Sequence, residues 1–158
     1  MTTQTAKLAA PNAYRALLYA ALIAGTLDLT YALVVYGLRG VPPVSIMQSI
    51  SSGLLGSAAF EHGAASATLG VVLHYLIMFV ICWIYWAASR RIGVLTERPV
   101  VMGLLYGIVV YIVMNFVVVP LSAVPGERHF TAFSIALAAA PMLFCVGLPI
   151  ALITRRFG

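Results

Sequence analysis

The sequence predicts an all-α membrane protein: one domain, residues 1–158, with four transmembrane helices in a bundle and a short extra helix on the outer side. Two observations predict this fold class. Hydrophobic residues make up 63% of the chain and charged residues only 8%, whereas a soluble domain carries about a quarter charged residues. Four apolar runs also reach the roughly 20 residues that a helix needs to cross a bilayer. We therefore expect the lipid bilayer to be the main partner of the surface.

The four apolar runs give the expected spans, at about residues 16–38, 67–88, 100–121 and 130–153. The first run follows Lys7 and Arg15, as the apolar part of a signal peptide would. It continues past Asp28, however, and no small-residue cleavage site follows, so we expect an uncleaved span. Pro141 and Pro149 are expected to kink the fourth span, because proline lacks an amide N–H and clashes with the preceding turn.

Basic residues indicate the orientation of the spans. Seven of them fall on one side of the predicted membrane: Lys7, Arg15, Arg90, Arg91, Arg98, Arg155 and Arg156. Only Arg39 and Arg128 fall on the other side. Since loops rich in lysine and arginine stay in the cytoplasm, we expect both termini to be cytoplasmic. The basic residues form clusters between apolar runs and no stripe on a soluble face, so nucleic acid is not an expected partner.

Residues 45–60 separate the first two spans on the outer side and follow Pro42-Pro43. Their apolar side chains fall on one helical face, which comprises Ile46, Met47, Ile50 and Leu54. Their polar side chains fall largely opposite, at Ser45, Gln48, Ser51 and Ser52. This segment is too short to cross the bilayer. We therefore expect either a helix that lies at the outer interface or a re-entrant hairpin.

Three polar side chains lie within the spans at similar expected depths: Asp28, His74 and Asn115. Helical rise places Asp28 roughly 15 Å below the outer end of its span. Each residue shares a helical face with small residues, as Asn115 does with Gly103 and Gly107. Such faces contact other helices, so we predict that the three residues form a buried polar cluster. Three tyrosines are able to join it: Tyr31, Tyr75 or Tyr111.

The predicted cluster has two interpretations. An aspartate beside a histidine can exchange a proton near neutral pH, which would make the cluster a site that handles protons or ions. The same groups can instead satisfy one another as contacts that hold the helices together. Both interpretations stay open from the sequence.

No metal, cofactor or catalytic site is expected. Glu61, His62 and His129 lie on separate outer loops, a pattern more typical of solvated loop residues than of metal ligands. Cys82 and Cys145 lie inside apolar runs without a CxxC motif, as small packing residues do. Signatures of serine hydrolases, zinc proteases, phosphate-binding loops and haem-binding helix pairs are missing from the sequence.

Several motifs resemble those of known families. Residues 103–120 (GLLYGIVVYIVMNFVVVP), with Ala123-Val-Pro125 and His129-Phe130, are similar to the YagU-like group of bacterial inner-membrane proteins. Asn115 stands where that group tends to carry a histidine. In the first half, Gly25-Thr-Leu-Asp28 and Arg39-Gly-Val-Pro42 resemble a set of four-span bacterial proteins. The resemblance implies the bacterial inner (cytoplasmic) membrane and a link to acid tolerance, and it supplies no catalytic residues.

Three classes of function are compatible with the sequence. The first, which we favour, is a small-solute, ion or proton-linked transport or stress protein, working as a homo-oligomer because four short spans enclose little room. The second is a non-catalytic accessory or scaffold subunit of a larger membrane complex. The third is a membrane enzyme with a lipophilic substrate and His74 and Asp28 as its acid–base pair. A polar cavity at Asp28 would favour the first, a fully packed core the second, and a groove open to lipid the third.

Overall fold

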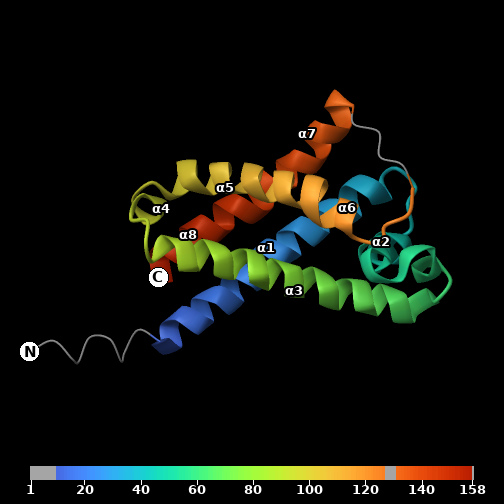
Figure 1. Ribbon diagram of the computed structural model, residues 1–158, viewed down its shortest axis with the longest axis horizontal. Coiled ribbons are helices and arrows are strands. Elements are labelled where there is room, and N and C mark those ends of the chain that lie inside the picture. Colours follow the sequence, from blue (N-terminus) through green and yellow to red (C-terminus); the bar gives the residue numbers. More distant parts are fainter. Residues whose placement is uncertain (1–9, 127–130, 158) are drawn as a thin grey trace, which may run out of the picture.

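The computed structural model describes residues 10–126 and 131–157, and every regular element in these ranges is a helix. Within them, four helices are long and apolar enough to cross a membrane: Leu17–Gly37, Gly63–Ser89, Pro99–Leu121 and Ala132–Phe157. Each expected span overlaps one of these helices, so the predicted all-α, four-span fold is confirmed (Figure 1). Some residues used above lie outside the described ranges, namely Lys7, Arg128, His129 and Phe130.

The chain order of the helices gives two hairpins. The first half contributes α1 (Ala10–Gly37), α2 (Pro43–Leu55) and α3 (Gly63–Ser89), with a 3₁₀ turn over Gly56–Phe60. The second half contributes α4 (Val94–Glu97), α5 (Pro99–Val113), α6 (Val119–Leu121), α7 (Ala132–Pro141) and α8 (Leu148–Phe157). A first π segment (Met114–Val118) joins α5 to α6, and a second π segment (Met142–Gly147) joins α7 to α8. The third and fourth spans are therefore each two α-helical pieces joined by a widened turn.

Prolines account for both widened turns. Pro120 comes two residues after the first π segment, and Pro149 comes two residues after the second. A proline cannot donate to the carbonyl four residues before it and its ring clashes with that carbonyl, so an extra residue in the preceding turn relieves the conflict. The disturbance expected around Pro141 and Pro149 in the fourth span thus takes the form of a π turn.

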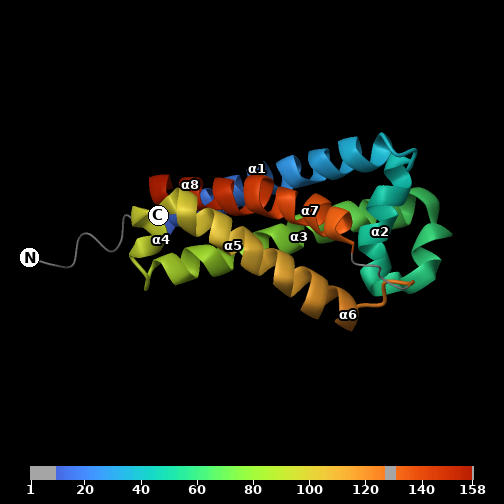
Figure 2. The same ribbon diagram turned by 90° about the horizontal axis from the view of Figure 1, so that it is seen from above.

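The helices pack tightly at one end of the bundle, where α1 begins and α8 ends (Figures 1 and 2). We call it the basic end, because it carries Arg15, Arg90, Arg91, Arg98, Arg155 and Arg156. A cluster of buried side chains from α1, α3, α8 and the second π segment leads away from it: Leu17, Ala20, Ala21, Ala24, Met78, Cys82, Tyr85, Val146, Ile150 and Ala151. Six of these ten residues are alanine, cysteine or valine, so the helix axes approach closely here.

Glycines bring the third and fourth spans into backbone contact. A Cβ atom at Gly107 would overlap the carbonyl of Met142, and one at Gly147 would overlap the carbonyl of Gly103. Only a residue without a side chain fits at such positions. The stripe of Gly103 and Gly107 predicted to contact another helix is confirmed, and its partners are the second π segment and the start of α8.

At the other end, the α2 end, the spans diverge and α2 runs across the gap (Figure 2). The predicted helix within residues 45–60 is therefore present, and it runs across the direction of the spans (Figures 1 and 2). Both of its faces contribute buried side chains, Ile46 and Met47 as well as Gln48, and the Gln48 amide donates to the carbonyl of Gly63 at 3.0 Å. Leu54 on the apolar face is 65% exposed.

Two further contacts fix the position of α2. A Cβ atom at Gly70 of α3 would overlap the carbonyl of Met47, so α2 lies directly on the backbone of α3. On the opposite side, the amide of Ala123 donates to the carbonyl of Gly53 at 3.0 Å. The loop that leaves the third span is thereby tied to α2, and α2 bridges the two hairpins.

Candidate functional site

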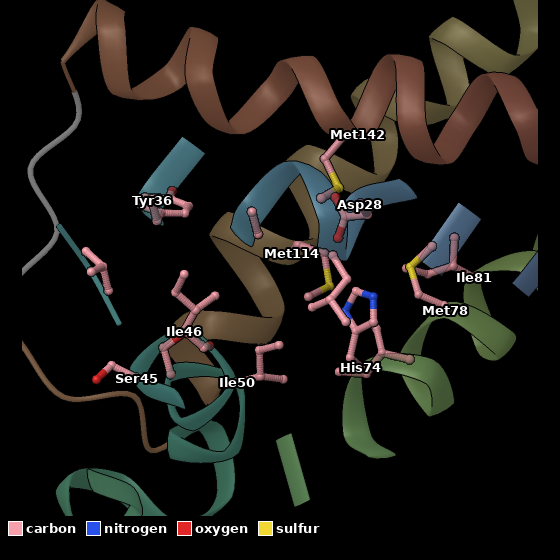
Figure 3. A pocket seen from close by; sticks show the side chains of 15 residues that line it. Asp28, Tyr36, Ser45, Ile46, Ile50, His74, Met78, Ile81, Met114 and Met142 are labelled. Carbon is pink, nitrogen blue, oxygen red and sulfur yellow. The ribbon is translucent and has the colours of Figure 1, made fainter. Parts of the chain in front are cut away.

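A cavity of about 500 Å³ lies where the spans diverge, between α1, α2 and α3 (Figure 3). Five polar side chains line it: Asp28, Tyr36, Ser45, Ser49 and His74. The other lining side chains are aliphatic or methionine, and none is lysine or arginine. Residues from all four spans contribute to the wall, since the third and fourth spans supply one methionine each. The site is therefore mainly apolar. Near neutral pH it contains one side chain that can carry a negative charge, Asp28, and one that can carry a positive charge, His74.

Asp28 enters the cavity from α1. Its side chain is half-buried, and among the described residues no hydrogen bond or ion pair reaches its carboxylate. It lies close enough to His74 for the two groups to interact electrostatically (Figure 3). A carboxylate at membrane depth costs on the order of 3 kcal/mol by insertion scales, so a group without a direct partner is an expensive feature to keep.

His74 faces Asp28 from α3 and is held in one orientation. Its Nε2 atom lies 2.9 Å from the carbonyl oxygen of Gly25, and the side chain is only 8% exposed. Because a carbonyl only accepts, Nε2 must carry a hydrogen in this contact. The contact with Gly25 therefore uses the hydrogen on Nε2 and leaves Nδ1 as the ring nitrogen outside it.

A neighbouring hydrogen bond adds a second link between α1 and α3. The hydroxyl groups of Tyr75 and Thr26 lie 2.9 Å apart, one residue further along each helix than the His74–Gly25 contact. A Cβ atom at Gly25 would come within 2.9 Å of the Tyr75 ring, so glycine is what lets the ring and the imidazole reach the α1 backbone. Two consecutive residues of α3 thus clamp two consecutive residues of α1.

The two methionines in the wall are the first residues of the two π segments. Met114 begins the first segment and Met142 begins the second, and both line the cavity with Asp28 and His74 (Figure 3). π turns inside α-helices frequently occur at functional sites. Both spans of the second hairpin therefore depart from α-helical geometry at the level of the cavity.

The structure brings together only part of the cluster predicted from the sequence. Asp28 and His74 share the cavity, but Asn115 is not among its lining residues. The Asn115 side chain donates to the carbonyl of Tyr111 at 2.9 Å, within its own span. Tyr31 donates to the carbonyl of Leu137 at 3.0 Å and so links α1 to α7.

The predicted cluster lacked the other three polar side chains of the wall, Tyr36, Ser45 and Ser49, and its three methionines, Met78, Met114 and Met142. For Ser45 a signal existed, since it lies on the polar face of a segment expected on the outer side. The methionines gave no such signal, because an apolar residue in an apolar span has no distinguishing feature in the sequence.

Other candidates from the sequence remain separate from the cavity. Cys82 is buried in the core and Cys145 is half-buried, and both are free thiols. Across residues 10–126 and 131–157, no group of three or more histidine, cysteine or acidic residues is placed to hold a metal ion. His129, which the sequence paired with Glu61 and His62, lies outside these ranges.

The four apolar spans define this chain as a multi-pass integral membrane protein whose helices contact lipid. No family model, no curated protein and no solved structure matches it. The resemblance to YagU-like proteins therefore stays an expectation from the sequence.

Proposed function

We propose that this protein transports a small solute through the α1–α2–α3 cavity and links that movement to protonation of Asp28 and His74. The observation that carries the proposal is the cavity itself, which reaches the acidic residue inside the first span and places a histidine opposite it. An acid and an imidazole in one cavity can hold, share or release a proton near neutral pH. An intramembrane carboxylate is typical of proton and ion pathways.

The alternatives account for this cavity less well. An accessory subunit was expected to have a continuously packed core, and packing of that kind is found towards the basic end but not where the spans diverge. An enzyme with Asp28 and His74 as an acid–base pair needs further groups to stabilise a developing charge. The other polar groups of the wall are two serine hydroxyls and one phenol. Transport needs only binding and a change of protonation.

The proposal includes a location and an orientation. We place the protein in a bacterial inner membrane with its basic end, and so both termini, in the cytoplasm. Support comes from the described arginines, six of which lie at the basic end while Arg39 lies near the α2 end. The cavity then opens on the outer half of the bilayer. A homo-oligomer stays a prediction, although the cavity is built from the helices of one chain.

Solute-driven proton movement tests the proposal. Purified protein is reconstituted into liposomes that contain a pH-sensitive dye, and cationic, neutral and anionic solutes are added outside one at a time. We expect at least one solute to change the internal pH in a protein-dependent manner. Asp28→Asn should abolish that change, because the amide keeps the shape of the side chain but can neither take up a proton nor carry the negative charge that a proton on His74 compensates.

Glu61→Gln is the matched control. It makes the same chemical replacement at an exposed position in the turn after α2, outside the cavity, and should leave the pH change intact. The proposal is wrong if no solute produces a protein-dependent pH change, or if Asp28→Asn moves protons as fast as the unaltered protein.

A further inference from the structure

We propose that the ligand of this cavity is a lipophilic organic cation: an amine or quaternary ammonium group on an apolar body. This inference rests on the proposed function and names its substrate class. It is carried by three properties of the wall, which are its charge, its size and its polarity.

Charge excludes anionic ligands. Asp28 is the acidic residue of the wall, and neither lysine nor arginine lines the cavity. The basic side chain nearest to Asp28 in the chain is Arg39, which lies two residues beyond the end of α1 and is not among the lining residues of the cavity. Its guanidinium group sits 5.2 Å from the centre of the Phe133 ring and 6.0 Å from that of Tyr36. An anion in the cavity would meet an unpaired carboxylate, whereas a cation would gain a charge-assisted contact with it.

Size and polarity exclude a bare inorganic cation. Hard metal ions need about six or more oxygen ligands to replace their hydration shell. The wall offers one carboxylate, two serine hydroxyls and one phenol, which are spread over α1 and α2. A volume of about 500 Å³ falls in the range of pockets for drug-sized organic molecules. Most of a bound ligand would touch aliphatic side chains, so its body must be apolar.

Methionine gives the wall its adaptability. Met78, Met114 and Met142 reach the cavity from three different spans, and they are half of the chain's six methionines. The flexible, polarisable thioether fits apolar surfaces of different shapes, which is why methionine is frequent in sites that accept several ligands. We therefore expect the site to recognise a charge on an apolar body and not one particular molecule.

The pairing of Asp28 with His74 also allows a bound cation to replace the proton on His74 as the positive charge beside Asp28. With Nδ1 of His74 protonated, the imidazolium compensates Asp28 and the cavity is neutral. A cation that binds beside Asp28 takes over this role, so the proton leaves Nδ1 and the total charge of the site stays the same. The other titratable groups near Asp28 are the hydroxyls of Tyr31 and Tyr36 on α1 and the thiol of Cys145 in the second π segment, and the Arg39 guanidinium lies beside Tyr36 and interacts with Tyr31. Phenols and thiols are uncharged near neutral pH, and α2 adds only serine hydroxyls to this wall.

Three naphthalene derivatives with the same ring test the inference: 1-naphthylmethylamine, 1-naphthylmethanol and 1-naphthylacetate, which are cationic, neutral and anionic at pH 7. Binding to the detergent-purified protein is measured by calorimetry in two buffers with different ionisation enthalpies. We expect the amine to bind at least about tenfold more tightly than the alcohol, since a charged hydrogen bond is the main difference between them. We also expect it to release a proton, which the comparison of the two buffers detects.

Asp28→Asn should weaken amine binding by at least about tenfold and leave binding of the alcohol unchanged. Glu61→Gln should bind both ligands as the unaltered protein does. If Asp28→Asn does not fold, Ser49→Trp fills the cavity from the exposed side of α2 and should reduce binding of the amine and the alcohol alike. Equal binding of amine and alcohol, tighter binding of the acetate, or full amine binding by Asp28→Asn overturns the inference.

The liposome assay separates this inference from the transport proposal. If only neutral or anionic solutes move protons through the unaltered protein and the amine does not bind, the ligand class is wrong and transport stands. If the amine binds through Asp28 but neither it nor any other solute moves protons, the ligand class stands and transport is wrong.

Discussion

Glycines occur at helix contacts near both ends of the bundle, but the helices are closely packed at one end and leave a cavity at the other. Towards the basic end, Gly103, Gly107 and Gly147 bring two backbones into contact and leave no space between them. Towards the α2 end, Gly25 and Gly70 also admit close neighbours, but the spans diverge beyond them and a cavity remains. Small residues therefore do not by themselves define a packed or an open region. What differs is the geometry of the span, because both π segments turn their methionines towards the open half.

The largest loss of stability is expected when a side chain is added where two helix backbones touch near the basic end. Gly147→Val places a side chain against the backbone of Gly103, which cannot move without separating the third and fourth spans. We expect a loss of about 3 kcal/mol or more in the free energy of unfolding, measured by denaturant titration in detergent. Gly37→Val is the control, because no atom lies within 4 Å of a Cβ atom built there. Equal stability of the two variants would show that the two spans are not in backbone contact.

The same substitution at two points of α1 compares the halves directly. Ala24 is 0% exposed in the core, whereas Ala32 lines the cavity. Ala24→Leu should therefore lower the free energy of unfolding by about 1–3 kcal/mol. Ala32→Leu has space for its side chain and should change it by no more than about 0.5 kcal/mol, while reducing binding of 1-naphthylmethylamine. Thermal unfolding and calorimetry measure the two effects, and a reversed order of stabilities contradicts the comparison.

A smaller and local effect is expected where α2 lies on α3. Gly70→Ala puts a methyl group against the carbonyl of Met47 and should displace α2 at a cost of about 1–2 kcal/mol. Hydrogen exchange should then rise in residues 43–55 and not in α5. Gly53→Ala is the control, since its Cβ atom would meet only the Cβ of Ser122, at an ordinary 3.8 Å. Unchanged exchange in α2 would mean that this contact does not hold it in place.

The smallest effect concerns a single hydroxyl near the basic end. The Tyr106 hydroxyl donates to the carbonyl of Ile81 at 2.7 Å, and its ring packs edge-on against Tyr85. Tyr106→Phe keeps the ring and removes the donor, which should cost about 1 kcal/mol of unfolding free energy. Tyr19→Phe, at an exposed position on α1, should cost nothing measurable. Thermal unfolding of the two variants shows whether the stability of the basic end depends on polar contacts as well as on packing. Equal unfolding temperatures would mean that the Tyr106 hydrogen bond contributes nothing measurable.

Much of the fold could be predicted because membrane spans are defined by length and apolarity alone. Asp28 and His74 could be paired for a related reason, since helical rise gives their depth and small neighbours such as Gly25 and Gly70 indicate a contact face. Asn115 was projected onto the same face by counting in steps of four from Gly103. Each such step turns by about 40° in an α-helix, so three steps carry Asn115 about 120° around the helix from Gly103, and the π segment that begins at Met114 changes the geometry further. The sequence therefore predicts depth better than it predicts direction around a helix that contains a proline.

The position of Met142 has a consequence for biosynthesis. α2 can settle on Gly70 of α3 as soon as the first hairpin has been made, because the two segments are neighbours in the chain. The cavity, however, takes part of its wall from a residue 114 positions after Asp28. Until the last span has entered the membrane, a nascent chain would hold an intramembrane acid beside an incomplete wall. The fourth span therefore completes the wall of the cavity as well as the bundle. A folding intermediate without this span would contain the His74–Gly25 and Tyr75–Thr26 contacts between α1 and α3 but an incomplete cavity.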